Sequence, residues 1–337
     1  MVYVSVRGRI LLNAEALNMT ESVGNYVKRR RVPVISPLQG GYGLFFVPAI
    51  SGEAVAHAYQ EILAEEARRK GLPVCKLCEK GIFLKSSNDN VVKYSFPNVT
   101  FPKRGDQDFG LKFERLVIKN CVVEDVGGFL FAPRTQRRGG GINVKRTSNF
   151  LTGYMIPVRE ALENVVIDPQ LHTRYALGTD FVKTEEQAGQ MIYYVEITSA
   201  AYTFSFDLDS KNIGRITFDA KRAGDLVVKE DEVKRRIEAA LDALAVLLIE
   251  ARFGAKRTRF LPNSEWESIG IAVSDDVWTL PSPFSKDYIT RAYKKKEKIN
   301  HGTTIYAYTG TGGVSLEETV LNAIEDAKKR LDEKRDR

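Results

Sequence analysis

The sequence is poor in the residues that build disulfide scaffolds, membrane spans and secretion signals. Three cysteines among 337 residues are typical of a reducing compartment. The longest apolar run, 239–249, is interrupted by Asp242 and is too short to span a membrane. The first residues lack a charged start followed by an apolar stretch. We therefore expect no signal peptide and a cytoplasmic location.

Motifs that mark an active site are also missing. There is no Gly-x-Ser-x-Gly elbow, and the glycines at 310–313 match neither a dinucleotide fingerprint nor a phosphate loop. Cys75 and Cys78 form a single Cys-x-x-Cys pair, whereas structural zinc requires four ligands. Cys121 and His57 could complete the set, but nothing in their spacing indicates it. We favour two buried thiols or a local disulfide, and expect no metal, no cofactor and no catalytic residue.

Basic residues, in contrast, are numerous and clustered. The net charge of +7 permits an anionic partner without requiring one. Segment 252–262 carries four basic residues, two aromatics and no acid, directly after an apolar helix. Such a mixture suits a phosphate backbone with stackable bases, although a solvated surface loop has the same composition. Further basic clusters lie at 28–31, 134–146 and 291–298.

Hydrophobic periodicity predicts an α+β fold. We predict strands at 2–12, 111–123, 191–198, 202–208 and 268–273. We predict helices at 53–69, 231–250 and 315–331, the last opened by a capping box. Reduced to its skeleton, the order is strand, helix, strand, strand, helix, strand, which is the split βαβ pattern of ferredoxin-like and RNA-recognition folds. The remaining intervals are then lobes inserted into a single domain, at about 26–48, 73–110 and 127–157.

Five sequence blocks, in order, resemble one family. They are NAEALNMTESVGN at 13–25, VPAISGEAVAHAYQ at 47–60, DVGGF at 125–129 with GYMIP at 153–157, YTFSF at 202–206, and AKRTRFLP at 255–262. Together they resemble the archaeal CRISPR-associated backbone subunit of subtype I-A, the DevR-like family of RAMP proteins. This resemblance implies a hand-shaped protein whose palm is RNA-recognition-like and carries inserted lobes.

The resemblance also implies a function and a set of partners. The family is a non-catalytic scaffold that polymerises along crRNA, forms the helical backbone of the type I-A Cascade interference complex, and supports pairing with target DNA. Its implied partners are crRNA, target DNA through the guide, further copies of itself, a 5′-handle-binding RAMP subunit, small and large subunits, and helicase and HD-nuclease effectors. Because a guide must pair with any invader, such a protein holds phosphate and sugar and leaves base edges free.

Carried over by position, the resemblance implies RNA contacts from basic and short polar residues. They are Lys256, Arg257, Arg259, Arg137, Arg138, Asn18, Ser22, Asn25, Ser51, Gly52, His57, His172 and Arg174. Amide groups at the start of the helix near Gly52 suit an anion. Purely structural roles stay open for some of them, since Ser51 could only cap a helix and the asparagines could only satisfy turns.

Two other functions fit parts of the sequence. A related RAMP endoribonuclease that processes CRISPR repeat RNA would use His57 or His172 as general base. The order of the family blocks favours the scaffold over this enzyme. A regulator that binds double-stranded DNA would need a recognition helix, and no such motif is present.

Overall fold

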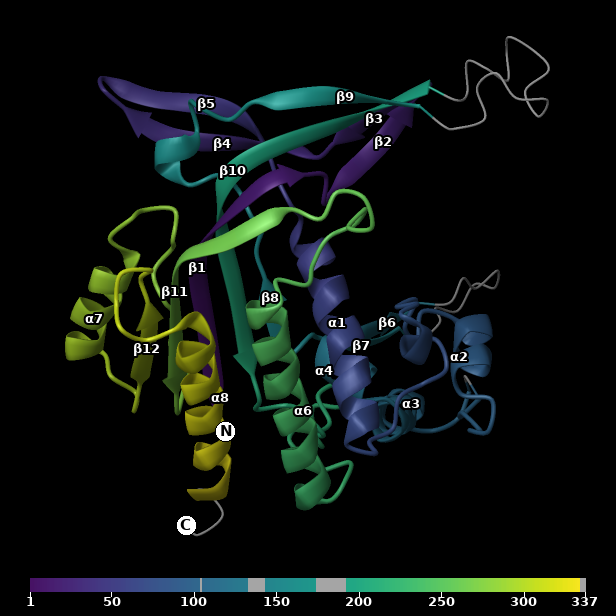
Figure 1. The fold of residues 1–337 in the computed structure, drawn as a ribbon. Helices are drawn as coiled ribbons and strands as arrows, with labels where there is room; N and C mark the ends of the chain where they lie inside the picture. The colour runs from purple at the N-terminus through teal and green to yellow at the C-terminus, as the bar shows by residue number, and fades with distance from the viewer. Residues whose placement is uncertain (104, 133–142, 174–191, 334–337) are drawn as a thin grey trace, which may run out of the picture.

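A three-stranded antiparallel unit forms the centre of the molecule. The structure, a computed structural model, describes residues 1–103, 105–132, 143–173 and 192–333. Strand β1 (Tyr3–Glu15) lies between β10 (Ile192–Asp209) and β11 (Asn263–Ser274) and is antiparallel to both (Figure 1). The side chains of Val4, Val6 and Ile10 are fully buried. Alternating apolar residues therefore form the predicted strand at the N-terminus.

Shorter strands extend this unit on both sides. Strand β12 (Thr304–Tyr308) pairs antiparallel with β11, and β8 (Phe150–Thr152) pairs antiparallel with the end of β10. Across the part of the sheet that contains the end of β10, the strand order is β12–β11–β1–β10–β8. The predicted mixture of helices with a central sheet is thus confirmed.

Strand β10 is continuous, so the hairpin predicted between 198 and 202 is wrong. Its second half pairs with β1, and its first half pairs antiparallel with β9 (Ile167–Thr173) and parallel with β3 (Tyr26–Arg29). Strand β2 (Met19–Val23) pairs antiparallel with β3 at the edge of the sheet. The small residues Ala200 and Ala201 stay paired with β1. A two-residue hairpin needs positive φ in its turn, which glycine or asparagine supplies and alanine disfavours.

Two predicted helices cover one face of the sheet. Helix α1 (Gly52–Arg69) packs beside α6 (Glu230–Ile249), and the hydroxyl of Tyr59 donates to the carbonyl of Ala240 at 2.9 Å (Figure 1). Tyr59 also contacts two aromatic rings of the sheet, Phe150 and Phe206. The predicted last helix is α8 (Leu316–Glu333), which packs against α6, β11 and β12. In the chain, α7 (Tyr288–Lys298) lies between β11 and β12.

The strand predicted at 111–123 is wrong, because this segment is helical. It forms α3 (Phe109–Asn120) and the start of α4 (Val122–Gly127). Phe109, Phe113 and Val117 recur every four residues and are all buried, which is the spacing of a helix face. The lobe around these helices also contains η1 (Cys78–Lys80), α2 (Asp89–Ser95), β6 (Phe129–Phe131) and β7 (Val144–Arg146).

Buried ion pairs tie this lobe to the helices on the sheet. Arg146 of β7 bonds Glu114 of α3 at 3.0 Å, and Arg236 of α6 bonds Asp125 of α4 at 2.8 Å. All four side chains are fully buried. Arg146 also donates to Asp125, so the four charges form one network. Buried charges require such pairing, because an isolated charge is costly in an apolar interior.

A separate β-hairpin of two strands lies at the top left of Figure 1, level with β9 of the large sheet. Strands β4 (Arg31–Leu38) and β5 (Gly41–Pro48) form it, with Val34 and Val47 packed inward on Leu162, beside η2 (Arg159–Ala161). The predicted lobe at 26–48 thus contributes β3 to the large sheet and the rest to this hairpin. No helix in the described part of the chain is long and apolar enough to cross a membrane.

Candidate nucleic-acid interface

The basic loop between α6 and β11 is attached to the segment that follows β1. The amide of Ala255 donates to the carbonyl of Leu17 at 2.7 Å. Gly254 has a φ of +85°, and a Cβ there would lie 2.6 Å from the Cβ of Leu17. Glycine is therefore required twice, for its backbone conformation and for the close approach. Two blocks far apart in the sequence meet at this point.

A groove of about 480 Å³ opens where the loop faces the first half of α1. Its lining includes Asn18, His57 and Arg257, which are all predicted site residues, together with Glu61 and Arg252. In Figure 1 the loop lies between the end of α6 and the start of β11, near the beginning of α1. The structure thus brings together predicted residues from three separate blocks.

The basic side chains of the loop differ in how they are paired. Arg252 forms an ion pair with Glu65 of α1 at 3.0 Å. Across the described residues, no carboxylate lies within 4.0 Å of Lys256, Arg257 or Arg259. Burial and the neighbouring Arg252 lower the pKa of Arg257 from its ordinary value. An anion placed beside Arg257 would relieve this repulsion, so the loop suits a phosphate.

Strand β9 places His172 against the same loop. Its ring lies 5.3 Å from that of Phe260, edge to face, and 5.3 Å from Tyr193, stacked. The Nε2 atom is buried and has no hydrogen-bond partner among the residues that the structure describes. His172 therefore supports one side of the loop. Phe253, the other aromatic of the loop, is only 2% exposed and belongs to the core.

Comparisons with known proteins identify the family of the chain. The model of the CRISPR-associated negative auto-regulator DevR/Csa2 family matches residues 6–293. The chain belongs to the DevR/Csa2 family. It is 37% identical to the "CRISPR-associated aCascade subunit Cas7/Csa2 2" of Saccharolobus solfataricus, over 96% of this chain and 98% of that protein. The "CRISPR-associated protein Cas7/Csa2 1" of the same organism is 34% identical, over 91% and 97%.

A solved structure shares the fold at low sequence identity. A chain of a "CRISPR RNA-guided surveillance complex, pre-nicking" aligns with a TM-score of 0.50 and 10% identity, covering 96% of this chain and 99% of that chain. The family resemblance inferred from the five blocks is thus confirmed, and the fold is similar to that of a chain in such a complex.

The polar residues near the start of α1 have structural bonds in this DevR/Csa2 chain. The Oδ1 atom of Asn18 accepts from Arg30 Nε at 2.9 Å and from the Ser51 amide at 3.0 Å. The Ser51 hydroxyl accepts from the Ala54 amide at 3.3 Å and caps the helix. A Cβ on Gly52 would lie 2.9 Å from the carbonyl oxygen of Thr152. Asn18 and His57 both line the groove, so a ligand there can contact them.

The other predicted residues lie elsewhere. Ser22 and Asn25 are exposed around the β2–β3 turn and do not line the groove. Arg137, Arg138 and Arg174 lie outside the described residues. Their proposed RNA contacts remain predictions.

The basic cluster at 28–31 is mostly paired within the fold of this family member. Arg29 is fully buried and forms an ion pair with Glu15, whose carboxylate also accepts from the Tyr202 hydroxyl at 2.7 Å. Arg31 pairs with Glu196 at 2.9 Å. The two carboxylates stand on other strands, β1 and β10, so the run of four cations in the sequence did not indicate that they are paired.

Sequence reasoning missed Glu61 as a lining residue of the groove, and it included Arg252 in the basic segment without foreseeing its ion pair. The one available signal was helical spacing, because Glu61 lies one turn after His57 and its Oε1 atom is 3.3 Å from His57 Nε2. The pairing of Arg252 with Glu65 required knowing that α1 and α6 lie side by side.

Proposed function

We propose that this chain is a guide-RNA-binding scaffold subunit of a type I-A Cascade complex and is not itself a nuclease. Membership of the DevR/Csa2 family supports the role, since a relative that is 37% identical carries the name of an aCascade subunit. On this proposal the protein grips the phosphate and sugar of crRNA and leaves the bases free to pair with target DNA.

The strand order and connectivity of the central sheet support an RNA-recognition-like palm. Strands β11, β1, β10 and β8 are adjacent in that order, and each neighbouring pair is antiparallel. Helix α1 stands between β1 and β8 in the chain, and α6 between β10 and β11. This is the arrangement of a split βαβ fold. The palm then carries β2–β5, the lobe of α2–α4, and the segment after β8 as insertions.

One observation carries the assignment of the RNA site. Lys256, Arg257 and Arg259 form no ion pair with any carboxylate among the described residues. They stand on a loop that is anchored to Leu17 and borders the groove with Asn18 and His57. Free cations on a braced loop bind phosphates with little loss of conformational freedom. We assign the guide backbone to this groove and loop.

An exposed apolar face supports stacking of copies along the RNA. In the β4–β5 hairpin, Ile35 pairs with Leu44, and Phe46 lies two residues further along the same face. All three side chains are exposed, whereas the alternate residues Val34 and Val47 pack inward. Exposed apolar patches commonly mark protein interfaces. We assign this face to a neighbouring copy in an open, head-to-tail filament. The proposed filament then recruits target DNA through the guide and the other Cascade subunits.

Electron microscopy and light scattering of the purified protein, with and without a guide RNA of about spacer length, test this function. We expect helical oligomers that form only with RNA, and RNA that stays intact. A double variant, Lys256→Ala with Arg257→Ala, should form fewer of them. A constant monomer beside unbound RNA would overturn the scaffold proposal, and shortened RNA would favour the endoribonuclease alternative.

A further inference from the structure

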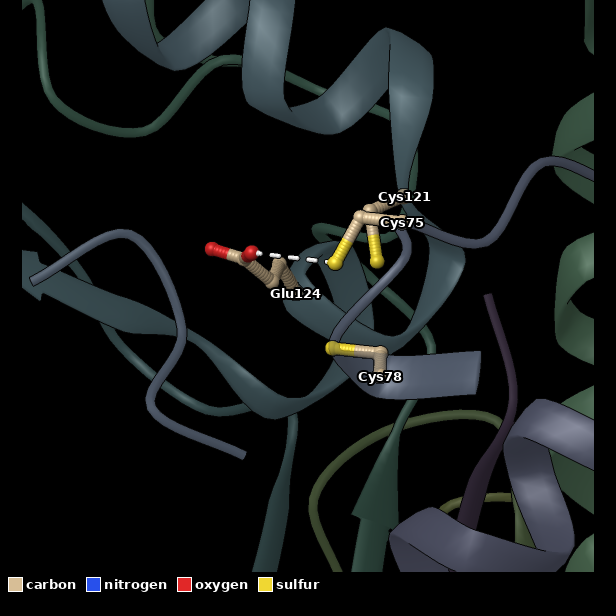
Figure 2. Close-up of side chains that lie close together, drawn as sticks. All are labelled: Cys75, Cys78, Cys121 and Glu124. Atoms are coloured by element: carbon tan, nitrogen blue, oxygen red, sulfur yellow. Dashed lines mark hydrogen bonds between the residues drawn. The ribbon is translucent and has the colours of Figure 1, made fainter. Parts of the chain in front are cut away.

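Three cysteines and one glutamate meet in the interior of the lobe of α2–α4. Cys75, Cys78, Cys121 and Glu124 are all buried, and their potential ligand atoms lie within 4.8 Å of one another. Figure 2 shows the four side chains turned toward one another, with the Glu124 carboxylate facing the sulfur of Cys75 at 3.7 Å. The cluster lies apart from the groove, since none of its members lines it.

The backbone around the cluster brings two pairs of residues together, Cys75 with Cys78 and Cys121 with Glu124. Cys75 precedes η1 and Cys78 is its first residue, and the Glu79 amide donates to the Cys75 carbonyl at 2.9 Å. Cys121 separates α3 from α4, and Glu124 lies in the first turn of α4. The Val122 amide donates to the Pro73 carbonyl at 2.9 Å and fixes one half against the other.

Glu124 has the environment of a ligand rather than of a surface acid. Its Oε2 atom accepts from the Ser86 amide at 2.8 Å, which orients the carboxylate. The side chain is fully buried, with an exposed fraction of 0%. In the described part of the chain, no arginine, lysine or histidine forms an ion pair with it. A buried carboxylate is costly without a partner, and a bound cation supplies one.

The arrangement of the three thiols is also consistent with metal binding. All three cysteines are free in the structure, although each is buried beside the others. Three buried thiols also leave one unpaired after any single disulfide, so a disulfide does not account for the whole set.

We propose that Cys75, Cys78, Cys121 and Glu124 bind one Zn²⁺ ion in a closed, tetrahedral structural site. Thiolates bind zinc at about 2.3 Å and carboxylates at about 2.0–2.2 Å, which sets tetrahedral edges of about 3.5–3.8 Å. The separation of 3.7 Å between Cys75 and Glu124 fits that edge. Small side-chain shifts bring the remaining atoms from within 4.8 Å to the same spacing. On binding, the thiol protons pass to solvent.

The proposed role of the ion is to hold the lobe together. Four protein ligands leave no open position for water or substrate, which is typical of structural rather than catalytic zinc. Lys85, whose Nζ donates to the Gly127 carbonyl at 2.6 Å, lies near enough to offset part of the negative charge of the ligands. The ion would join the turn after α1 to the α3–α4 junction. This inference does not depend on the RNA-binding proposal.

The first test is the metal content of the full-length protein, purified under reducing conditions without a chelator. We expect about one zinc per chain by elemental analysis, or the same content after the apoprotein is incubated with Zn²⁺ and desalted. Cobalt substituted into the apoprotein should give the visible absorption of tetrahedral thiolate coordination. Chelator should lower the thermal midpoint of the wild-type protein, and added Zn²⁺ should restore it, which tests the site even if cysteine variants do not fold.

Matched variants then test the ligand set. Cys121→Ser and Glu124→Gln should lose stoichiometric metal, whereas Glu79→Gln, an acid beside the same turn, should keep it. Glu124→Cys should retain the metal and shift the cobalt spectrum toward four thiolates. A protein that stays free of metal after incubation with Zn²⁺, or keeps one zinc in both Cys121→Ser and Glu124→Gln, would overturn the proposal. A disulfide within the cluster, found by mass spectrometry in fully folded protein, would overturn it as well.

Discussion

Gly254 and Leu17 approach so closely that a single added methyl group at Gly254 would lie 2.6 Å from the Leu17 Cβ. Together with the Ala255–Leu17 hydrogen bond of 2.7 Å, this contact attaches the basic loop to the end of β1. The position of the loop therefore depends on packing as much as on its charge.

Replacing Gly254 by alanine should destabilise the protein more than the same change at Gly40. Both glycines have a similar positive φ, but nothing lies within 4 Å of a Cβ at Gly40. Gly40→Ala should cost about 1–2 kcal/mol for the left-handed backbone. Gly254→Ala should cost roughly 1–3 kcal/mol more for the overlap with Leu17. Chemical denaturation of both variants measures the difference, and equal losses would contradict the packing argument.

Loss of one loop cation should weaken binding to every RNA sequence alike. Lys256→Ala and Arg257→Ala should each reduce the slope of log affinity against log salt by about 0.7, the contribution of one phosphate contact on a single strand. Filter binding or fluorescence anisotropy at several salt concentrations measures this slope. Lys329→Ala, on the exposed part of α8, is the control. A loss restricted to certain sequences would instead indicate base readout.

The two aromatics of the loop should behave differently when replaced. Phe260 is half-buried beside His172, so Phe260→Ala should reduce RNA affinity by about 1–3 kcal/mol if a base stacks there. Phe253 is buried against Phe204, so Phe253→Ala should lower stability by about 3–5 kcal/mol. Unchanged affinity in a folded Phe260→Ala variant would assign that ring to support of the loop alone.

Removing one charge from the buried ionic network should strongly destabilise the fold. Arg236→Met leaves the Asp125 carboxylate, which the wild-type arginine bonds at 2.8 Å, without one of its two arginine partners. We expect a loss of about 3–5 kcal/mol in the free energy of unfolding. Arg235→Met, on the exposed side of the same helix, should change it little. Similar small losses in both variants would show that Arg146 alone neutralises Asp125.

Polar substitution on the outer face of the β4–β5 hairpin should prevent filament growth without unfolding the subunit. Leu44 and Phe46 are exposed, so replacing both by serine removes little buried area from the monomer. Sedimentation with a long guide RNA should then show shorter assemblies. Affinity for a short oligonucleotide that holds one subunit should be unchanged, and normal filaments from this variant would place the interface elsewhere.

Local periodicity was sufficient to predict a helix or strand where the element has a single buried face. The helices around Tyr59 and Leu241 and the strand of Val4 and Val6 were all predicted, because their apolar residues recur at one spacing. It failed at 111–123, where a run of apolar residues fitted a strand as well as a helix. It failed again at Ala200, because small residues are compatible with a turn and only pairing with β1 keeps the strand straight.

By itself, the sequence determined the family, through five ordered blocks, and the chemistry of the basic loop, through its composition. Tertiary structure alone decided which cations are paired. Arg29 and Arg31 form ion pairs with Glu15 and Glu196 on other strands, whereas Lys256 and Arg259 pair with no carboxylate in the part of the chain that the structure describes. It also decided that Cys121 and Glu124 meet Cys75 and Cys78. The physical reason is that charge pairing and metal geometry depend on distances between segments, and local sequence patterns report only the face on which a residue stands.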